Sequence, residues 1–235
     1  MDNQLIYDVG MHNGNDTAYY LFKGYNVVAI DANPLLIKEA ESRFSKEIES
    51  GQLTLLNIGI SEKEEELEFW VNDSKSEWSS FDKKFGCRQN LPCHSVKVQS
   101  YPFKEILQKF GIPYYLKIDI EGSDHLCLRA LQDFKNEDLP EYVSVEVCRL
   151  EWLYLIYGLG YKSFQLVNQS KNWKIDHIPG WKFEKGCSGV FGEDILGSWE
   201  RNIEKVAYQW LHHKMGFPER HSMGQGWFDF HAKKA

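Results

Sequence analysis

The sequence has no long apolar run, and this absence excludes the simplest membrane-spanning architecture. No apolar stretch within the 235 residues reaches the roughly 18 residues that a transmembrane helix needs. The opening MDNQLIYDVG has no basic segment before its apolar residues, and the apolar run is too short for a signal peptide. We therefore expect a soluble protein of the cytoplasm.

Positive charge is also scarce. The chain has 27 Lys and Arg against 34 Asp and Glu, which gives a net charge of −7. Because nucleic acid phosphates attract basic surfaces, this balance disfavours a nucleic-acid-binding protein. Hydrophobic residues make up 43% of the chain, enough to build a packed core, so an intrinsically disordered protein is excluded.

Closely spaced cysteine pairs of the CxxC type are absent. The five cysteines are Cys87, Cys93, Cys127, Cys148 and Cys187. An odd number without CxxC argues against a disulfide scaffold and against a zinc ribbon. Cys87, Cys93 and His94 could join Cys187 around a metal, but the spacing matches no common site. We expect free thiols in a reducing compartment and no bound metal.

Short apolar segments alternate with helical ones in the first quarter of the chain. Each predicted helix ends in a glycine, a favoured residue just past a helix end. Strand–helix alternation indicates parallel pairing with right-handed crossovers, and hence an α/β fold. The predicted strands are 4–10, 26–33 and 52–60, and the predicted helices are 15–24 and 34–51.

A β-rich insertion is predicted at about 66–100. Residues 64–72 alternate charged and apolar side chains, as a half-exposed strand does, and 73–95 are polar and irregular. Another strand follows at 96–103. The parallel set then resumes with helices at 103–111 and 123–134 and strands at 114–122 and 141–147.

The end of the chain, about 168–235, is predicted to be a helical and aromatic extension. Residues 162–169 and 187–195 are predicted as an antiparallel strand pair at the sheet edge. A helix over 198–216 places Ile203 and Val206 on one stripe with Trp199 and Trp210, and Gly216 and Pro218 end it. We expect one domain, residues 1–235, built on a mostly parallel seven-stranded sheet flanked by helices.

Tryptophans and histidines are concentrated outside the predicted parallel strands. Flat aromatic faces suit sugars and other hydroxylated substrates, although tryptophans that merely cover the sheet are the alternative. Five of the eight tryptophans are considered for this role: Trp70, Trp78, Trp173, Trp181 and Trp227. Four histidines follow residue 211, and a solvated tail is the expected setting for them. They are His212, His213, His221 and His231.

A glycine ends the first predicted strand. Gly10 and Gly14 form GxxxG and lack the third glycine of the dinucleotide fingerprint. Glycine at the first strand–helix turn lets a cofactor approach the backbone, and the next helix start offers free N–H groups. Asp31 ends the second strand, 21 positions after Gly10, where an acid can accept hydrogen bonds from a ribose diol. The pattern predicts an adenosine-type ligand; a tight glycine turn and a helix cap at Asp31 are the alternatives.

Polar residues also end the third and fourth parallel strands. Asn57 and Ile58 can offer an amide and an apolar face to an adenine ring, or simply form a turn. Asp119 and Glu121 are costly to desolvate without partners, which favours a functional role over simple pairing with Lys117. His125 follows inside the next helix as a candidate proton acceptor, or as an ordinary half-buried histidine.

Four segments together resemble the FkbM-type methyltransferases, which use S-adenosylmethionine. DVGMHNGNDT is similar to the family's opening DVGAHxGxxT, AIDANP to its FEPNP, and NIGISEKEEELEFWVN to its NxALSDxxGxxxF. LKIDIEGSDHLCLRAL is close to LKIDVEGxExxVLxGA, and Ser79 begins a serine pair seen in the family's insertion. The resemblance runs from Leu5 to about Val147, and Met11 and Gly59 depart from it.

The resemblance implies a Rossmann-like class I methyltransferase fold that binds S-adenosylmethionine. It places Gly10 and its neighbours around the methionine part, Asp31 at the ribose, Asn57 and Ile58 near adenine, and Asp119 near the transferred methyl group. The implied cofactor-binding residues are Asp8, Gly10, His12, Asn13, Gly14, Asp31, Ala32, Asn57, Ile58, Ser79 and Asp119.

The sequence thus predicts a methyltransferase that acts on a hydroxyl of a small molecule, sugar or glycan. Asp119, Glu121 or His125 would remove the hydroxyl proton, and no metal is required. A nicotinamide-dependent oxidoreductase and a non-catalytic binding protein on the same fold are the alternatives. A nucleic-acid partner is not expected, because the chain is acidic and no DPPY-like motif follows the fourth strand.

Overall fold

The computed structural model describes residues 4–214 and 226–234. These residues form two compact units, Met1–Leu139 and Pro140–Ala235, which are taken in turn. The prediction of one domain over 1–235 stays a prediction. Gly216, Pro218 and His221, which figure in the expectations for the tail, lie outside the described residues.

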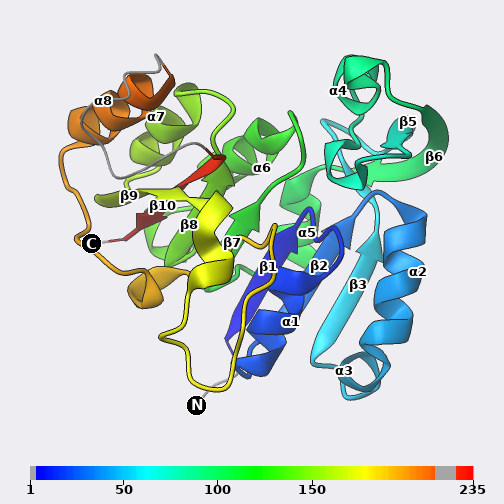
Figure 1. Cartoon of the computed structure of the whole chain (residues 1–235), viewed down its shortest axis with the longest axis horizontal. Coiled ribbons are helices and arrows are strands. Elements are labelled where there is room, and N and C mark those ends of the chain that lie inside the picture. Colours follow the sequence, from blue (N-terminus) through cyan, green and yellow to red (C-terminus); the bar gives the residue numbers. More distant parts are fainter. Residues whose placement is uncertain (1–3, 215–225, 235) are drawn as a thin grey trace. The chain divides into compact units, whose positions relative to one another are not determined.

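The first unit is built on four parallel strands in the order β3-β2-β1-β7 (Figure 1). Buried aliphatic and aromatic side chains from β1, β2 and β7 form its centre. The parallel strands are β1 (Leu5–Val9), β2 (Asn26–Asp31), β3 (Leu53–Asn57) and β7 (Tyr115–Ile118). The helices between them are α1 (Asn15–Phe22), α2 (Pro34–Arg43), α3 (Ser45–Glu49), α5 (Phe103–Phe110) and α6 (Asp124–Ala130).

Strand order decides where the side chains at the strand ends meet. Strands β1, β2 and β3 step in one direction across the sheet, so right-handed crossovers put α1 and α2 on the same face. Strand β7 lies on the other side of β1, and the β1–β7 register sets Asp8 opposite Lys117. All four carboxyl ends therefore share one edge, where ligands bind in this kind of sheet.

The predicted helix over 34–51 is divided at Phe44 into α2 and α3. Phe44 has φ −112° and ψ 27°, outside the helical region. Its ring packs at the glycine turn after β1, where a Cβ on Gly14 would lie 2.8 Å from Phe44 Cε2. The helix is thus divided at Phe44, which makes a tertiary contact that helical periodicity alone does not predict.

The insertion is a three-stranded sheet in the order β4-β6-β5, as its alternating pattern predicts. Strands β5 and β6 pair antiparallel, and Phe69, Val71 and Val98 form a small core that Ala32 and Phe81 join. In Figure 1 the insertion lies beyond the carboxyl ends of β2 and β3. Its elements are β4 (Gly59–Ile60), β5 (Glu65–Asn72), η1 (Ser76–Trp78), α4 (Lys83–Gly86), η2 (Arg88–Asn90) and β6 (Cys93–Tyr101).

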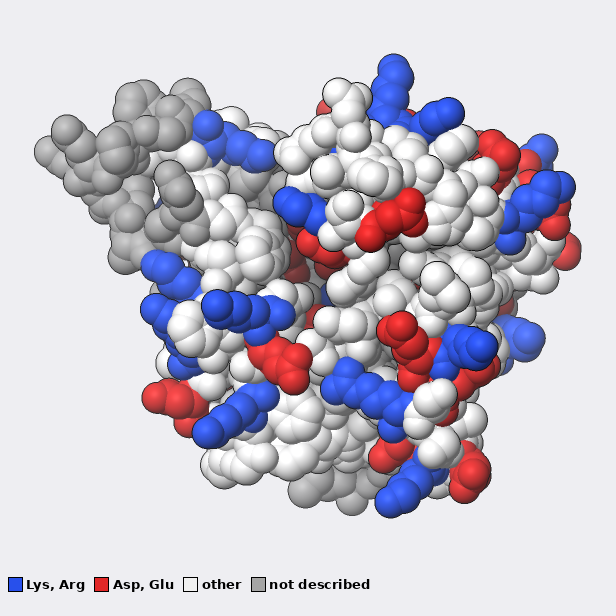
Figure 2. All heavy atoms as spheres, turned by 45° about the vertical axis from the view of Figure 1, so that its right-hand side comes forward, with Lys and Arg blue, Asp and Glu red and all other residues white. Residues whose placement is uncertain are grey.

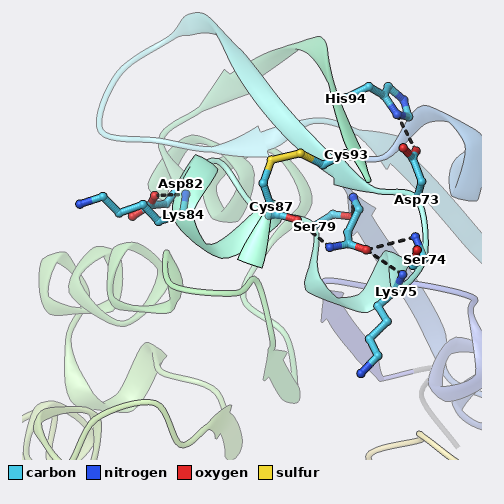
Figure 3. The surroundings of a disulfide bond; sticks show 11 residues. Asp73, Ser74, Lys75, Ser79, Asp82, Lys84, Cys87, Cys93 and His94 are labelled. Atoms are coloured by element: carbon cyan, nitrogen blue, oxygen red, sulfur yellow. Dashed lines mark hydrogen bonds and ion pairs between the residues drawn. A yellow bond between two sulfur atoms is a disulfide. The ribbon is translucent and has the colours of Figure 1, made fainter. Parts of the chain in front are cut away.

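A disulfide closes the insertion, and the expectation of five free thiols is wrong for two of them. Cys87, just after α4, is joined to Cys93 at the start of β6, with a Cα–Cα distance of 5.5 Å (Figure 3). Cys127, Cys148 and Cys187 are free. An odd cysteine count weighs against a scaffold of several bridges, but it does not bear on a single bridge across a short turn.

The second unit carries the strands β8 (Tyr142–Glu146), β9 (Ser163–Asn168) and β10 (Phe228–Lys233). Strand β10 lies between β8 and β9 and pairs antiparallel with both. The predicted strand at 187–195 is wrong, because Gly189 and Gly192 have left-handed backbone there and the segment ends in η6 (Gly192–Asp194). The strand that pairs with β9 is instead β10, whose sequence is FDFHAK.

The remaining elements of this unit cover that sheet. Helix α8 (Ile203–Lys214) buries Ile203 and Val206 of the predicted stripe, but it begins later than the predicted residue 198, so Trp199 lies before it, and Trp210 is only half-buried. The elements η5 (Gln169–Lys174) and α7 (Glu151–Gly158) were not among those expected. His231 was expected in a solvated tail and is instead 2% exposed within β10. Burial lowers the pKa of His231 to about 3, so its ring is neutral.

The strand order over the chain is β3-β2-β1-β7-β8-β10-β9, which gives a mostly parallel seven-stranded sheet with flanking helices. This confirms the predicted fold class. None of the helices in the described part of the chain is long and apolar enough to cross a membrane.

Candidate functional site

A buried lysine joins the ends of β1 and β7. Lys117 Nζ donates to Asp8 Oδ1 at 3.0 Å and to the Gly10 carbonyl oxygen at 2.9 Å. The same nitrogen lies 3.9 Å from Asp119 Oδ2 and 4.0 Å from Asp16 Oδ2. Burial alone would lower the pKa of Lys117, but the neighbouring carboxylates outweigh it and leave the pKa well above its usual value. The lysine is therefore a fixed positive charge beneath the strand ends.

Gly10 is required by the backbone of the neighbouring strand. Its φ is +86°, and a Cβ built on it would lie 1.7 Å from the Asp119 carbonyl oxygen. The N–H groups of Gly10 and Met11 both donate to the Ile30 carbonyl oxygen, at 2.9 and 3.0 Å. The glycine thus lets the turn after β1 lie directly against the segment after β7, which supports the tight-turn interpretation of the sequence.

Asp31, at the end of β2, is held by two backbone donors. Its Oδ2 accepts from the His12 N–H and its Oδ1 from the Asn33 N–H, each at 2.8 Å. Burial raises the pKa of Asp31 to about 6 against the opposing effect of these two bonds. The cap of α2 is Asn33, whose Oδ1 accepts from the Leu35 N–H, so Asp31 does not serve as the helix cap.

Asn57 connects the end of β3 to the same place. Its Nδ2 donates to the carbonyl oxygens of Asp31 and Ala32, at 3.0 and 3.2 Å. The Asn57 side chain is exposed, whereas Ile58 and Ala32 are half-buried. The structure therefore brings the predicted ribose and adenine residues together along the ends of β2 and β3.

The glycine turn also contacts the insertion. His12 Nε2 lies 2.8 Å from Ser76 Oγ, and burial lowers the pKa of His12. Asn13 is exposed, and its Oδ1 accepts from the Asn15 N–H at the start of α1. Ser79 is buried within the insertion, where its Oγ accepts from the Asn72 N–H at 3.1 Å.

The predicted strand at 114–122 ends early. Strand β7 stops at Ile118, and Glu121 has φ +44° in a turn. Asp124 closes that turn, since its carboxylate oxygens accept from the N–H groups of Ile120 and Gly122, at 3.0 and 3.3 Å. Asp119 and Glu121 therefore leave the strand instead of alternating along it, and Asp124 is a structural acid that strand periodicity did not reveal.

The two candidate acids have different settings. The Asp119 side chain is 38% exposed, and Lys117 approaches one of its oxygens only to 3.9 Å. Both oxygens of Glu121 are engaged by Arg88, at 3.1 and 3.2 Å, and its carbonyl oxygen accepts from Ser80 Oγ. Burial raises the pKa of Glu121 to about 6, although Arg88 opposes the shift. Lys117 thus neighbours Asp119, and the charge partner of Glu121 is Arg88.

His125 lies in the first turn of α6 and is half-buried. Arg88 is a charged neighbour of the candidate site that the sequence did not indicate, because it stands 33 positions before Glu121 in a polar, irregular segment. Lys117 was visible in the sequence only as a possible partner of the acids beside it.

A cavity of about 430 Å³ lies between the insertion and the start of α6. The predicted cofactor and catalytic residues are not among its lining residues. The lining residues are Ile60, Ser61, Glu62, Lys63, Glu65, Leu67, Phe81, Ser123 and Leu126. Within residues 4–214 and 226–234, no cluster of His, Cys, Asp and Glu has the arrangement of a metal site.

Comparison with solved structures finds methyltransferase folds of low identity. A precorrin-6y C5,15-methyltransferase from Geobacter metallireducens is 11% identical with a TM-score of 0.45, covering 100% of this chain and 82% of its own. An rRNA methylase from Streptococcus thermophilus is 11% identical with a TM-score of 0.41, covering 99% and 87%. A Streptococcus mutans protein in complex with S-adenosylhomocysteine is 10% identical with a TM-score of 0.44, covering 99% and 89%. At these values no substrate is carried over to this chain.

The sequence itself gives the stronger comparison. No curated protein matches the chain. The family model described as the methyltransferase FkbM domain matches residues 8–154, which include both glycines of the turn, Asp31, Asn57 and the acids after β7. Because this match covers well over half of the chain, the protein belongs to the FkbM family of S-adenosylmethionine-dependent methyltransferases.

Proposed function

We propose that the protein transfers the methyl group of S-adenosylmethionine to a hydroxyl group of a small molecule, sugar or glycan. The observation that carries the proposal is Asp119, a partly exposed carboxylate beside the Gly10 turn. Methyl transfer to oxygen needs an aligned hydroxyl and a group that accepts its proton. A carboxylate at this edge, with neither oxygen within hydrogen-bonding distance of Lys117, supplies that group.

The residues of the strand ends suit the cofactor in their chemistry. Each oxygen of Asp31 already accepts one backbone N–H, and a carboxylate oxygen has a second lone pair for a ribose hydroxyl. Asn57 and Ile58 would flank the adenine, and Asp8, Gly10, His12, Asn13 and Gly14 would surround the methionine part. The bound cofactor supplies a methyl group on a positively charged sulfur. Ala32 and Ser79 complete the proposed set.

Asp119 is the favoured proton acceptor among the three candidates. Glu121 has both oxygens engaged by Arg88, which reduces its capacity to accept a proton from substrate. His125 is half-buried in the first turn of α6 and remains the third candidate. Lys117 Nζ lies 3.9 Å from Asp119 Oδ2, beyond hydrogen-bonding distance, which leaves the carboxylate able to orient the acceptor hydroxyl.

The face of the molecule drawn in Figure 2 is in keeping with a small substrate. On the face drawn in Figure 2, basic and acidic side chains of the described residues are interspersed among uncharged ones. Binding of nucleic acid draws on clustered Lys and Arg along the phosphate backbone. A small hydroxylated acceptor needs no such cluster, so the mixed charge supports the proposed substrate class.

Calorimetry with S-adenosylhomocysteine tests the cofactor part of the proposal. The wild-type protein is expected to bind it, and Asp31→Ala is expected to weaken binding about tenfold or more. Each lost charge-assisted hydrogen bond contributes about 1.5 to 3 kcal/mol. The variant should stay folded, because Asp31 ends its strand. Unchanged affinity in a folded variant would show that Asp31 does not hold the ribose.

Asp119→Asn tests the chemical step. The amide keeps the shape of the side chain and removes the charge. Methyl transfer from labelled S-adenosylmethionine to a panel of sugars and other hydroxylated acceptors should fall roughly 100-fold, the scale of a positioned proton acceptor. Affinity for S-adenosylhomocysteine should change far less. Loss of affinity together with turnover would make Asp119 a cofactor ligand, and turnover equal to wild type would exclude it as the base.

A further inference from the structure

Arg88, in η2 of the insertion, pairs with Glu121 in the turn after β7. Its Nη1 and Nη2 donate to Glu121 Oε2 and Oε1, a two-point contact that fixes the plane of the carboxylate. The Arg88 guanidinium also lies 4.2 Å from the centre of the Trp78 ring. The Arg88 and Glu121 side chains are 27% and 16% exposed, so the pair is largely withdrawn from solvent.

The segment that carries Arg88 is closed by the disulfide. We call residues 87–93, from Cys87 to Cys93, the bridged loop (Figure 3). Within it, Gln89 and Asn90 have φ of +60° and +53°, a left-handed conformation that costs free energy in residues other than glycine. Such a turn persists only where its surroundings impose it. The Leu91 N–H donates to the Arg88 carbonyl oxygen across this turn at 3.4 Å, and the covalent link joins the two ends of the loop around it.

Backbone contacts also hold the residues on either side of the bridged loop. Before the loop, Asn72 Nδ2 donates to the Gly86 carbonyl oxygen at 2.8 Å. After it, the Asp73 N–H donates to the Pro92 carbonyl oxygen at 2.9 Å. These bonds fix the end of α4 and the residue before β6 independently of the covalent link. Arg88 lies between them, beside the bridge itself.

We propose that Arg88 is a positioning residue for Glu121, and that the Cys87–Cys93 bridge holds Arg88 in place and makes this contact sensitive to reduction. The inference rests on the proposed function in treating Glu121 as part of the active site. The bridge opens by thiol–disulfide exchange with a dithiol reductant. The protein disulfide gains two electrons and two protons to give two thiols, and the dithiol is oxidised to its own disulfide.

Reduction has a defined chemical consequence at Glu121. Once the bridge opens, the left-handed turn relaxes and Arg88 moves away from the carboxylate. The charged groups that face Glu121 are then Asp119 and Asp124, and both raise its pKa. Glu121 therefore gains a proton near neutral pH, and the charge at this edge of the site changes by one unit. Disulfides persist in oxidising compartments, so the state of the bridge follows the surroundings.

Carbon-13 NMR of labelled glutamate carboxyl groups measures this directly and needs no acceptor substrate. Glu121→Gln identifies the Glu121 resonance by its loss. Arg88→Met is expected to raise the pKa of Glu121 by about one unit, the scale of a lost arginine partner. Arg88→Lys keeps the charge without the two-point contact and should give a smaller rise. Lys84→Met, a matched loss of positive charge on the exposed side of α4, should leave the pKa unchanged. A wild-type pKa in folded Arg88→Met would overturn the positioning role.

The redox part is tested on the wild-type protein with dithiothreitol, followed by reoxidation. The reduced protein should titrate like Arg88→Met, and so should Cys87→Ser/Cys93→Ser. Cys148→Ser, at an exposed free cysteine, should behave as wild type. An unchanged Glu121 pKa in the reduced protein would overturn the role of the bridge. Calorimetry with S-adenosylhomocysteine on the same samples separates the two proposals, because absent binding with the expected NMR shift rejects the proposed function alone.

Discussion

Two carboxyl groups of the first unit, Asp31 and Glu121, have pKa values of about 6 for the same main reason, burial. They differ in what holds them. Asp31 is fixed by backbone N–H groups from the turn after β1 and from its own strand end. Glu121 is fixed by a side chain from the insertion. The strand ends therefore supply their own partners, whereas the turn after β7 depends on a separate segment.

The two cations at this edge show the same contrast. The Lys117 side chain is 3% exposed, and it contacts groups on β1, α1 and the segment after β7. The Arg88 side chain is 27% exposed and pairs with one acid. If the strand ends are the stable part and the insertion the adjustable part, then removal of each cation should have a different main effect. Loss of Lys117 should destabilise the fold, and loss of Arg88 should chiefly alter Glu121.

Lys117→Met gives the largest expected effect. Removing one partner of a buried ion pair leaves the other charge uncompensated, which costs about 3 to 5 kcal/mol. Asp8, with no exposed surface, is the charge left behind. Urea unfolding should show this loss, while Arg88→Met should lose only about 1 kcal/mol, as partly exposed pairs do.

Asp8→Asn added to Lys117→Met is the control for this mechanism. The second change removes the uncompensated carboxylate. Thr17 remains as a hydrogen-bond partner for the new amide, since its Oγ1 donates to Asp8 Oδ2 at 2.6 Å in the wild type. The double variant should recover part of the lost stability. If Lys117→Met is no less stable than Arg88→Met, the distinction between a rigid strand edge and an adjustable insertion is wrong.

Two glycines with the same backbone angle sharpen the comparison within the strand edge. Gly10 and Gly24 both have φ +86°, but a Cβ on Gly10 meets the Asp119 carbonyl oxygen at 1.7 Å, and a Cβ on Gly24 meets nothing within 4 Å. Gly24→Ala should cost about 1 to 2 kcal/mol for the left-handed conformation alone. Gly10→Ala should cost about 3 kcal/mol or more, because the backbone clash adds to that cost. Thermal unfolding of the pair gives the difference, and equal losses would mean that β1 and β7 can separate freely at this point.

The strand edge was also the part that the sequence predicted well. The positions of Gly10, Asp31 and Asn57 follow from apolar runs that end in polar residues, and local order along the chain decides which strand ends become neighbours. The acids after β7 were predicted as a group, yet their turn was not, because Asp124 ends the strand through two backbone N–H groups that no periodicity marks.

Three features of the insertion and of the end of the chain were missed, and for a different physical reason. The Arg88–Glu121 contact and the Cys87–Cys93 bridge join residues that are brought together by the turns of an irregular segment. Strand β10 closes its sheet from the far end of the sequence, after a helix, so its antiparallel partners are not its neighbours in the chain. Apolar runs and spacing carry local information, whereas the Arg88–Glu121 contact and the pairing of β10 are non-local, and the Cys87–Cys93 bridge depends on the conformation of an irregular turn.

The smallest effect is expected for pH and cofactor binding at Asp31. Its pKa of about 6 is raised above the usual value, so the carboxylate is mainly ionised at pH 7 and mainly protonated at pH 5. Protonation removes an acceptor for the ribose hydroxyls, and affinity for S-adenosylhomocysteine should therefore fall as pH decreases through 6, by about tenfold at most between pH 7 and 5. The amino and carboxyl groups of the ligand titrate outside this window. Asp31→Asn should bind weakly and without this dependence, whereas Glu121→Gln, which removes another acid with a pKa of about 6, should keep it. If Glu121→Gln abolishes the dependence and Asp31→Asn retains it, the cofactor senses the turn after β7, and the division of roles between the two carboxyl groups must be reversed.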